Sequence, residues 1–232
     1  MPAPGAEGTH PAGFWRRYLA YCIDWSLLAP VLYFLLRSPA SAAWSALLSV
    51  NRLLQDWLLG QLGSGAALPS PLSLSGALMQ DTALFASVQA AMHSLTAAVT
   101  RTLLLGAAVA AIYFIGFEAS RWQATPGKRL LDLTVVDMRG GPVGWRGAGL
   151  RFLAGSLSWL SLNLGHAMAG WRADGRALHD LIAGTQVQAH SPMPRWGRWL
   201  LYAQLMLLLA VILGLFGRLV WLLGQLSAAD AP

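Results

Sequence analysis

Three long apolar runs alternate with more polar segments along the chain. The first, Tyr18 to Leu36, is close to the roughly 20 residues that an α-helix needs to cross the core of a bilayer. The second, about residues 97–117, is the apolar end of a helical pattern that begins at Ser75. The third runs from Trp199 to Leu226. These runs predict three transmembrane helices.

A fourth apolar run, Phe152 to Trp171, is either a full span or a helical hairpin that enters the membrane and returns. If it returns, 12 of the 16 Lys and Arg residues lie on the cytoplasmic side; if it spans, the bias falls to eight against eight, or nine against seven. The positive-inside rule therefore favours the re-entrant hairpin. Gly155, Asn163 and Gly165 are its candidate break points, because irregular backbone is tolerated at depth when protein buries it.

Alternating apolar and polar positions interrupt the helical pattern twice. The alternation from Leu131 to Val136, followed by Gly140-Gly141, predicts a β-hairpin. A second alternating stretch, Ala183 to His190, predicts a further strand. The fold class that we predict is an all-α membrane protein with about three transmembrane helices plus a re-entrant helical hairpin, or four spans, and a small cytoplasmic β element.

The remaining segments set the domain boundaries. Residues 1–13 are rich in Pro, Gly and Ala and predict a disordered tail. Residues 14–190 form the membrane domain, with an insert at 37–96, and residues 191–232 form the C-terminal transmembrane helix. Within the insert, the pattern from Leu47 to Leu62 predicts an amphipathic helix at the membrane interface. A break follows at Gly63 to Ser75, which is rich in Gly, Pro and Ser.

A cleaved signal peptide is the alternative interpretation of the first apolar run. Arg16 and Arg17 would form its basic region, and Ala40-Ser41-Ala42 resembles a cleavage site. Asp24 inside the apolar stretch and the spans downstream argue against this interpretation.

Composition agrees with a membrane protein. The chain is 56% hydrophobic and 11% charged, whereas about a quarter of the residues in a soluble domain are charged. The net charge of +6 could indicate nucleic-acid binding, but the arginines flank apolar segments, which is typical of membrane orientation. Cys22 is the single cysteine, so an intrachain disulfide is excluded.

No motif for chemistry is present. "TPGKRLL", residues 125–131, lacks the first glycine and the final Ser or Thr of a phosphate-binding loop. Neither a Cys/His metal spacing nor a G-x-S-x-G nucleophile turn occurs. We therefore expect a protein that is not an enzyme and that uses no cofactor, no catalytic residue and no metal.

Asp24 is an ionisable residue about two turns into the first span. A charged residue at the centre of a span costs roughly 2.5–3.5 kcal/mol on insertion scales and is a functional candidate by default. Binding of a proton or cation is one interpretation, and a structural hydrogen-bond role is the other. Arg17 lies seven residues earlier, too far to pair with Asp24, and we expect it to point to the interface. Candidate partners of Asp24 are Asn163, His166, Arg151 and Arg101.

The last span carries small residues at intervals of seven. Seven residues drift only about 20° around a helix, so these residues form one stripe, and small side chains let helices approach closely in lipid. The alternative is chance in a chain rich in Ala and Gly. The stripe consists of Ala203, Ala210, Gly217 and Gly224.

Three blocks together resemble the RDD family of bacterial membrane proteins. They are Arg17-x-x-Ala20-x-x-Ile23-Asp24, "TPGKRLLDLTVVDMRGGPV" and "RALHDLIAGTQV". The family takes its name from one Arg and two Asp, and Arg17 and Asp24 match the first two. Asp180 is the best match for the second aspartate, with Asp132 and Asp137 as alternatives.

The resemblance implies a multi-pass protein of the bacterial cytoplasmic membrane, and the charge bias places its N-terminus in the cytoplasm. It also implies a role in transport of a cation, a proton or a small solute, directly or as a transport subunit. The alternative is a non-enzymatic membrane scaffold or assembly partner. Expected partners are the lipid bilayer and either a second copy or another membrane protein, with no nucleic acid.

Overall fold

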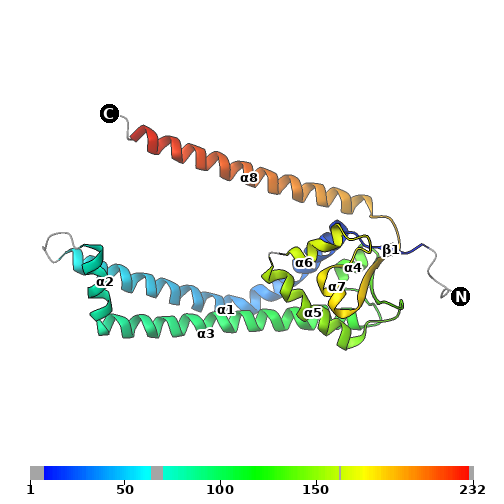
Figure 1. The fold of residues 1–232 in the computed structure, drawn as a ribbon, viewed down its shortest axis with the longest axis horizontal. Coiled ribbons are helices and arrows are strands. Elements are labelled where there is room, and N and C mark those ends of the chain that lie inside the picture. The colour runs from blue at the N-terminus through cyan, green and yellow to red at the C-terminus, as the bar shows by residue number, and fades with distance from the viewer. Residues whose placement is uncertain (1–7, 64–69, 162, 230–232) are drawn as a thin grey trace. The chain divides into compact units, whose positions relative to one another are not determined.

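A computed structural model describes residues 8–63, 70–161 and 163–229, and helices dominate it (Figure 1). The helices are α1 (Phe14–Leu62), α2 (Pro71–Gln80), α3 (Thr82–Ala119), α4 (Pro126–Leu130), α5 (Gly144–Leu160), α6 (Leu164–Ala167), the 3-10 helix η1 (Met168–Gly170), α7 (Leu178–Ala183) and α8 (Arg195–Ala229). The strands are β1 (His10–Pro11), β2 (Leu133–Asp137) and β3 (Thr185–Ala189). The predicted class, a helical membrane protein with a small β element, is confirmed.

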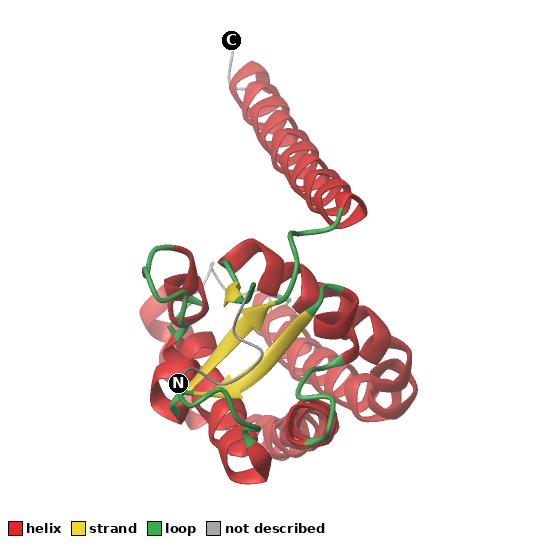
Figure 2. Cartoon of the chain, turned by 90° about the vertical axis from the view of Figure 1, so that its right-hand side faces the viewer, coloured by secondary structure: helices red, strands yellow, loops and turns green. Residues whose placement is uncertain are grey.

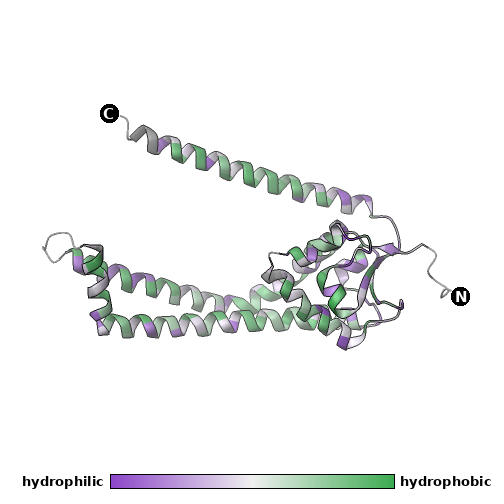
Figure 3. Ribbon diagram, in the orientation of Figure 1, coloured by the Kyte–Doolittle hydropathy of each residue, from purple (hydrophilic) through white to green (hydrophobic). Residues whose placement is uncertain are grey.

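Three helices are long and apolar enough to cross a membrane: α1, α3 and α8 (Figure 3). This agrees with the three predicted spans. α1 has 49 residues and α3 has 38, which correspond to about 73 Å and 57 Å of helix. The hydrocarbon core of a bilayer is about 30 Å thick. Each of these two helices therefore continues well beyond the membrane core.

The chain divides into two compact units. Unit 1 comprises residues 1–25 and 113–232, and unit 2 comprises residues 26–112. The two polar sites described below lie in unit 1, whereas unit 2 contains the whole of the predicted insert, residues 37–96.

Unit 2 differs from the prediction in two places. The expected separate helix from Leu47 to Leu62 is wrong, because α1 continues through Pro39 without interruption; a proline removes one helical hydrogen bond, and here that loss does not end the helix. The single helix expected from Ser75 is also wrong, since it breaks at Asp81. The Asp81 carboxylate accepts a hydrogen bond from the Leu84 N–H at 2.8 Å and so caps the start of α3.

The predicted break after α1 is only partly visible. Residues 64–69, inside the segment from Gly63 to Ser75, lie outside the described residues. After them, the Ser70 hydroxyl accepts from the Ser73 N–H at 3.2 Å and caps α2. Polar residues thus set the helix boundaries at this end of unit 2.

Unit 1 is built around a three-stranded antiparallel sheet in the order β1-β3-β2 (Figure 2). The predicted strand within Ala183 to His190 is confirmed as β3, and Val135 of β2 faces Val187 of β3. The expected hairpin after β2 is reduced to a single bridge between Val136 and Pro142. Pro142 has no N–H with which to extend the ladder, so β3 is the main partner of β2.

The buried core of unit 1 joins this sheet to the first turns of α1. Side chains from alternate strand positions meet the helix face that carries Leu19 and Ala20. The core consists of Ala12, Leu19, Ala20, Leu131, Leu133, Val135, Val187 and Ala189.

The N-terminal segment is more ordered than predicted. Residues 1–7 of the expected tail lie outside the described residues. Over residues 8–13 the prediction of disorder is wrong, because His10 and Pro11 pair with β3 and the Ala12 N–H donates to the Val187 carbonyl at 2.9 Å. The edge of β3 supplies backbone hydrogen-bond partners, which the Pro-, Gly- and Ala-rich composition of residues 1–13 does not indicate.

The fourth apolar run forms a helical hairpin. α5 ends at Leu160, and Asn163 takes the left-handed conformation with φ 65° before the chain continues into α6. Asn163 is therefore the break point, while Gly155 lies inside α5. Gly165 packs so closely that a Cβ there would lie 2.3 Å from the Ser158 Oγ. Entry of this hairpin into a membrane stays a prediction.

The small-residue stripe of α8 is exposed along the helix. At Gly217 an added Cβ would have no neighbour within 4 Å in the described structure. No residue is buried in the most apolar 18-residue window of α8, so close packing of the stripe also stays a prediction.

Candidate functional site

Asp24 is fully buried and accepts three hydrogen bonds from neutral donors. Its Oδ1 accepts from the Tyr113 hydroxyl at 2.8 Å and from the Gly127 N–H at 2.7 Å. Its Oδ2 accepts from the Thr125 hydroxyl at 2.5 Å. Asp24 has an exposed fraction of 0%. One carboxylate thus joins α1 to the end of α3 and to the start of α4.

The sequence Thr125-Pro126-Gly127 fits this contact closely. A Cβ at Gly127 would lie 2.2 Å from the Ala20 carbonyl oxygen and 2.8 Å from Asp24 Oδ1. Only glycine therefore allows α4 to approach α1 so closely. Thr125 is the N-cap of α4, and Pro126 occupies its first turn, where the missing N–H costs nothing. This part of the "TPGKRLL" motif is explained by its contact with Asp24.

The predicted partners of Asp24 are wrong. Asn163, His166, Arg151 and Arg101 were expected, but the hydrogen bonds come from Tyr113, Thr125 and Gly127. The prediction sought a charged or amide partner, whereas two hydroxyls and a backbone N–H satisfy the carboxylate. Helix N-terminal N–H groups are common partners of carboxylates.

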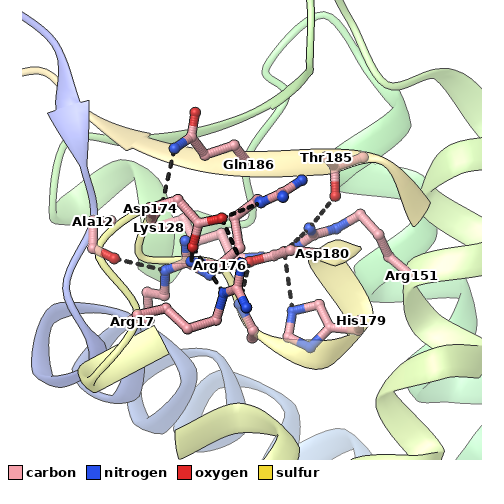
Figure 4. A network of polar contacts seen from close by, with 12 residues as sticks. Ala12, Arg17, Lys128, Arg151, Asp174, Arg176, His179, Asp180, Thr185 and Gln186 are labelled. Carbon is pink, nitrogen blue, oxygen red and sulfur yellow. Dashed lines mark hydrogen bonds and ion pairs between the residues drawn. The ribbon is translucent and has the colours of Figure 1, made fainter. Parts of the chain in front are cut away.

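Asp180, on α7, is the second fully buried aspartate, and its partners are charged (Figure 4). It forms ion pairs with Arg17 of α1 and Arg151 of α5. His179 Nε2 lies 3.3 Å from its Oδ1, and the Ala177 N–H donates to its Oδ2 at 3.0 Å. The carboxylate therefore joins α1, α5 and α7 through buried charges.

Arg151 extends this cluster to α3. Its Nε donates to Glu118 at 2.9 Å, and its Nη1 donates to the Thr185 hydroxyl at 2.7 Å. Glu118 also pairs with Lys128. Arg151 and Glu118 are 4% and 5% exposed, so this is an ion-pair chain inside the protein. We call the five residues Arg17, Asp180, Arg151, Glu118 and Lys128 the buried charge network.

The environment shifts the pKa values of this network strongly. Burial by itself would raise the pKa of Asp180, but the charges of Arg151 and Arg17 outweigh it and hold that pKa well below its usual range. Burial by itself would lower the pKa of Arg151, but Glu118 and Asp180 raise it above its usual value. Burial, followed by the charge of Arg151, lowers the pKa of His179 to about 3. Asp180 is thus ionised and His179 neutral near pH 7.

Arg17 and Asp180, two of the predicted functional residues, meet directly. Arg17 was expected to point to the membrane interface; its side chain is 12% exposed and its Nε donates to the Ala12 carbonyl at 2.9 Å, and its position relative to the membrane stays a prediction. The expectation that Arg17 does not pair with Asp24 agrees with the structure. The alternatives for the second aspartate lie elsewhere, with Asp132 exposed and Asp137 accepting from the Gly141 N–H in a turn.

Several residues of these sites were not singled out from the sequence. Glu118 and Tyr113 could have been predicted as site residues, because a polar residue at the end of an apolar helix needs a partner. Arg16 could not: its side chain is 5% exposed and its Nε donates to the Leu131 carbonyl at 2.8 Å. Arg16 also bonds the Ser191 carbonyl, which ties the segment after β3 to α1.

Four buried polar atoms, one each from α1, α5, α6 and α7, have no hydrogen-bond partner within the part of the chain that the structure describes. They are Arg17 Nη2, Ser158 Oγ, His166 Nδ1 and His179 Nδ1. The rings of His166 and His179 lie 5.0 Å apart. Buried polar atoms are nearly always paired, with ordered water when protein is not available. Among the described residues, no group of three or more His, Cys, Asp or Glu side chains could hold a metal ion.

Comparison with known proteins identifies the membrane domain. Residues 11–184 match the RDD family, and this match includes Arg17, Asp24 and Asp180 and ends before α8. The chain is 27% identical over 178 residues to the uncharacterized protein YxaI of Bacillus subtilis (strain 168), which covers 76% of this chain and 96% of that protein. No solved structure matches the chain. With three apolar helices and a family match over most of its length, the chain is a membrane protein that belongs to the RDD family.

Proposed function

We propose that this protein moves a proton or a small cation across the bacterial cytoplasmic membrane, directly or as a subunit of a transporter, and that it is not an enzyme. The observation that carries the proposal is the burial of two aspartates, Asp24 and Asp180, in a domain with membrane-spanning helices. Ionisable groups inside membrane proteins are costly and mark ion or proton pathways.

The unpartnered polar atoms support this proposal. Arg17 and His179 contact Asp180, the His166 ring lies beside His179, and Ser158 lies in α5; each presents one such atom. Water that hydrates them would provide the polar interior that a proton or ion needs. The buried charge network then holds the helices that line this interior in place.

Asp24 is the group that we assign to proton or cation binding. Its partners are neutral, so no arginine or lysine competes for its carboxylate. The Tyr113 and Thr125 hydroxyls can rotate and accept a hydrogen bond when the carboxyl carries a proton. Asp180 is less suited, because two arginines already neutralise it.

The decisive experiment compares wild-type protein with Asp24→Asn in reconstituted vesicles under a cation gradient. Asparagine can keep the hydrogen bonds, with its oxygen facing Tyr113 and Gly127 and its amide facing Thr125, but it cannot titrate. We expect ion-driven proton movement in the wild type and its loss in the variant. Equal movement in both would refute the role of Asp24.

The N-terminus is assigned to the cytoplasm from the charge distribution. Unit 1 holds 13 of the 16 Lys and Arg residues, of which Arg218 lies near the far end of the spanning helix α8, and 12 therefore remain with the sheet and the hairpin; unit 2 holds Arg37, Arg52 and Arg101. The positive-inside rule then places the sheet and the hairpin in the cytoplasm or at its membrane surface.

Single cysteines in a Cys22→Ser background test this orientation. Arg139→Cys and Ala173→Cys, both exposed, should resist an impermeant thiol reagent in intact cells and react after lysis. Ser75→Cys, exposed in unit 2, should react in intact cells. Labelling of position 173 in intact cells while position 139 stays protected would instead mean that the α5–α6 hairpin spans the membrane.

A scaffold or assembly role is the second candidate. It is favoured by the complete hydrogen bonding of Asp24, which is what a purely structural carboxylate would show. It predicts that Gly217→Leu on the exposed stripe of α8 weakens assembly with a second copy or another membrane protein. An unchanged size profile in mild detergent, together with ion movement by the wild type, would reject this role.

A further inference from the structure

The first two turns of α8 carry two arginines and two aromatic residues on one face. Arg195, Arg198, Trp199 and Tyr202 line a hollow of about 420 Å³. The rings of Trp199 and Tyr202 meet edge to face at 6.3 Å. All four residues are exposed. The hollow belongs to α8 alone, which lies beyond the part of the chain that matches the RDD family.

The opposite face of the same turns is anchored to the core. Gly197 is buried, and a Cβ there would lie 3.3 Å from side-chain atoms of Leu19 and Leu131. Leu201, one turn later, is 8% exposed. Because residues four apart share a helix face, this contact turns Arg195, Arg198 and Trp199 outward.

The outward face lies where α8 enters the membrane. The candidate span begins at Arg195, and its apolar window has the highest hydropathy of the three spans. Trp and Tyr are enriched at the boundary between headgroups and hydrocarbon. Arg195 and Arg198, in the turn before Tyr202, therefore stand at the depth of lipid phosphates.

Among the residues that the structure describes, no acid pairs with these two arginines. α8 contains neither Asp nor Glu, and the ion pairs found in the described part of the chain involve neither Arg195 nor Arg198. A guanidinium presents two parallel N–H donors that match phosphate oxygens. The two aromatic rings add a surface for the glycerol and upper acyl region.

We propose that this face of α8 is a binding site for the phosphate headgroup of an anionic glycerophospholipid. Arg195 and Arg198 would bind the phosphate, and Trp199 and Tyr202 would pack against the apolar part of the same lipid. This site is independent of Asp24 and of ion movement. It gives the C-terminal helix a function as a lipid-dependent anchor for the sheet of unit 1.

The test uses the full-length protein in mild detergent, with phosphatidylglycerol and phosphatidylcholine added in equal amounts and bound lipid measured by native mass spectrometry. Wild type should retain phosphatidylglycerol preferentially. Arg195→Gln/Arg198→Gln should reduce that retention about 25-fold, because each basic residue near an anionic surface strengthens binding by roughly fivefold. Unchanged retention in this variant, or equal retention of both lipids by the wild type, would overturn the proposal.

Two controls separate this site from general charge and from free phosphate. Arg139→Gln/Arg146→Gln removes two exposed arginines elsewhere in unit 1 and should keep the preference; an equal loss would overturn the site. Inorganic phosphate at the lipid concentration should leave the lipid bound, and complete displacement would overturn the assignment to a lipid. Arg195→Lys/Arg198→Lys keeps the charge and should retain most of the preference, which shows that loss in the Gln variant is not loss of folding.

Discussion

Asp24 and Asp180 are both fully buried, yet their surroundings differ in kind. Asp24 is held by two hydroxyls and one backbone N–H, and Asp180 by two arginines beside a neutral histidine. A carboxylate with neutral donors can gain or lose a proton with little rearrangement of charge. A carboxylate between two guanidinium groups cannot, because neutralising it leaves buried positive charges unpaired. The difference makes Asp180 part of a structural ion-pair network and leaves Asp24 as the carboxylate with neutral partners.

Removing the charge of Asp180 should have the largest effect. Asp180→Asn leaves Arg17 and Arg151 without their shared carboxylate, and breaking a buried ion pair costs about 3–5 kcal/mol. We expect a severe loss of stability in denaturation experiments in detergent. Asp174→Asn is the matched control, because Asp174 pairs with Arg172 and Arg176 near the surface and should change stability little. Similar losses in both variants would contradict the distinction.

Gly127→Ala tests the close contact at Asp24. The new Cβ would meet the Ala20 carbonyl oxygen at 2.2 Å, so α1 and α4 must separate, and overpacking of this kind costs about 1–3 kcal/mol. The measurement is the free energy of unfolding. Gly149→Ala, in α5 with open space around it, should be neutral or slightly stabilising. An unchanged free energy of unfolding in Gly127→Ala would mean that α4 does not pack tightly against α1.

Asp24→Asn and Asp24→Ala together separate shape from charge. The asparagine should lose less than about 1 kcal/mol of stability, since it keeps partners for Tyr113 and Thr125. The alanine should lose about 1–3 kcal/mol, because it leaves buried donors unsatisfied. Thermal denaturation in detergent distinguishes them. If Asp24→Asn loses as much stability as Asp24→Ala, the carboxylate of Asp24 is itself needed for stability. Asp24 would then have a structural role like that of Asp180.

His179→Gln should change the pH dependence of stability. The folded pKa of His179 is about 3, below the unfolded value of about 6.5. The unfolded state therefore binds more protons between these values, and stability falls as pH drops from about 6.5 toward 3, by at most about 1.4 kcal/mol per pH unit. Glutamine can still donate to Asp180 but does not titrate, so unfolding followed from pH 7 to pH 4 should show a shallower slope. An identical slope would mean that His179 is protonated when folded.

Protonation of Asp180 lowers stability over a lower pH range than protonation of His179 does. Its folded pKa is lowered by Arg151 and Arg17 against the effect of burial, so its stabilisation is complete above the unfolded pKa of about 4. It is lost only as pH falls below that value toward the folded pKa. The slope between pH 6.5 and pH 4 therefore reports His166 and His179, whose pKa values burial lowers.

The sequence by itself determined the features that depend on local pattern. The length of the apolar runs predicted the three spans, and alternation predicted β2 and β3, because each signal is contained in a few consecutive residues. The hairpin was also predicted, with Asn163 as one of three candidate break points. The spacing of Arg17 and Asp24 also showed that these two residues do not pair. Block order in the chain was enough to identify the family.

Only the tertiary structure decided which polar groups meet. Arg17 pairs with a carboxylate 163 residues away, and Asp24 bonds Thr125 at a separation of 101 residues. No local pattern encodes such contacts, since they depend on which helix faces approach and how closely. The approach at Asp24 is possible because Gly127 has no side chain, and that reason becomes visible only when α1 and α4 lie together.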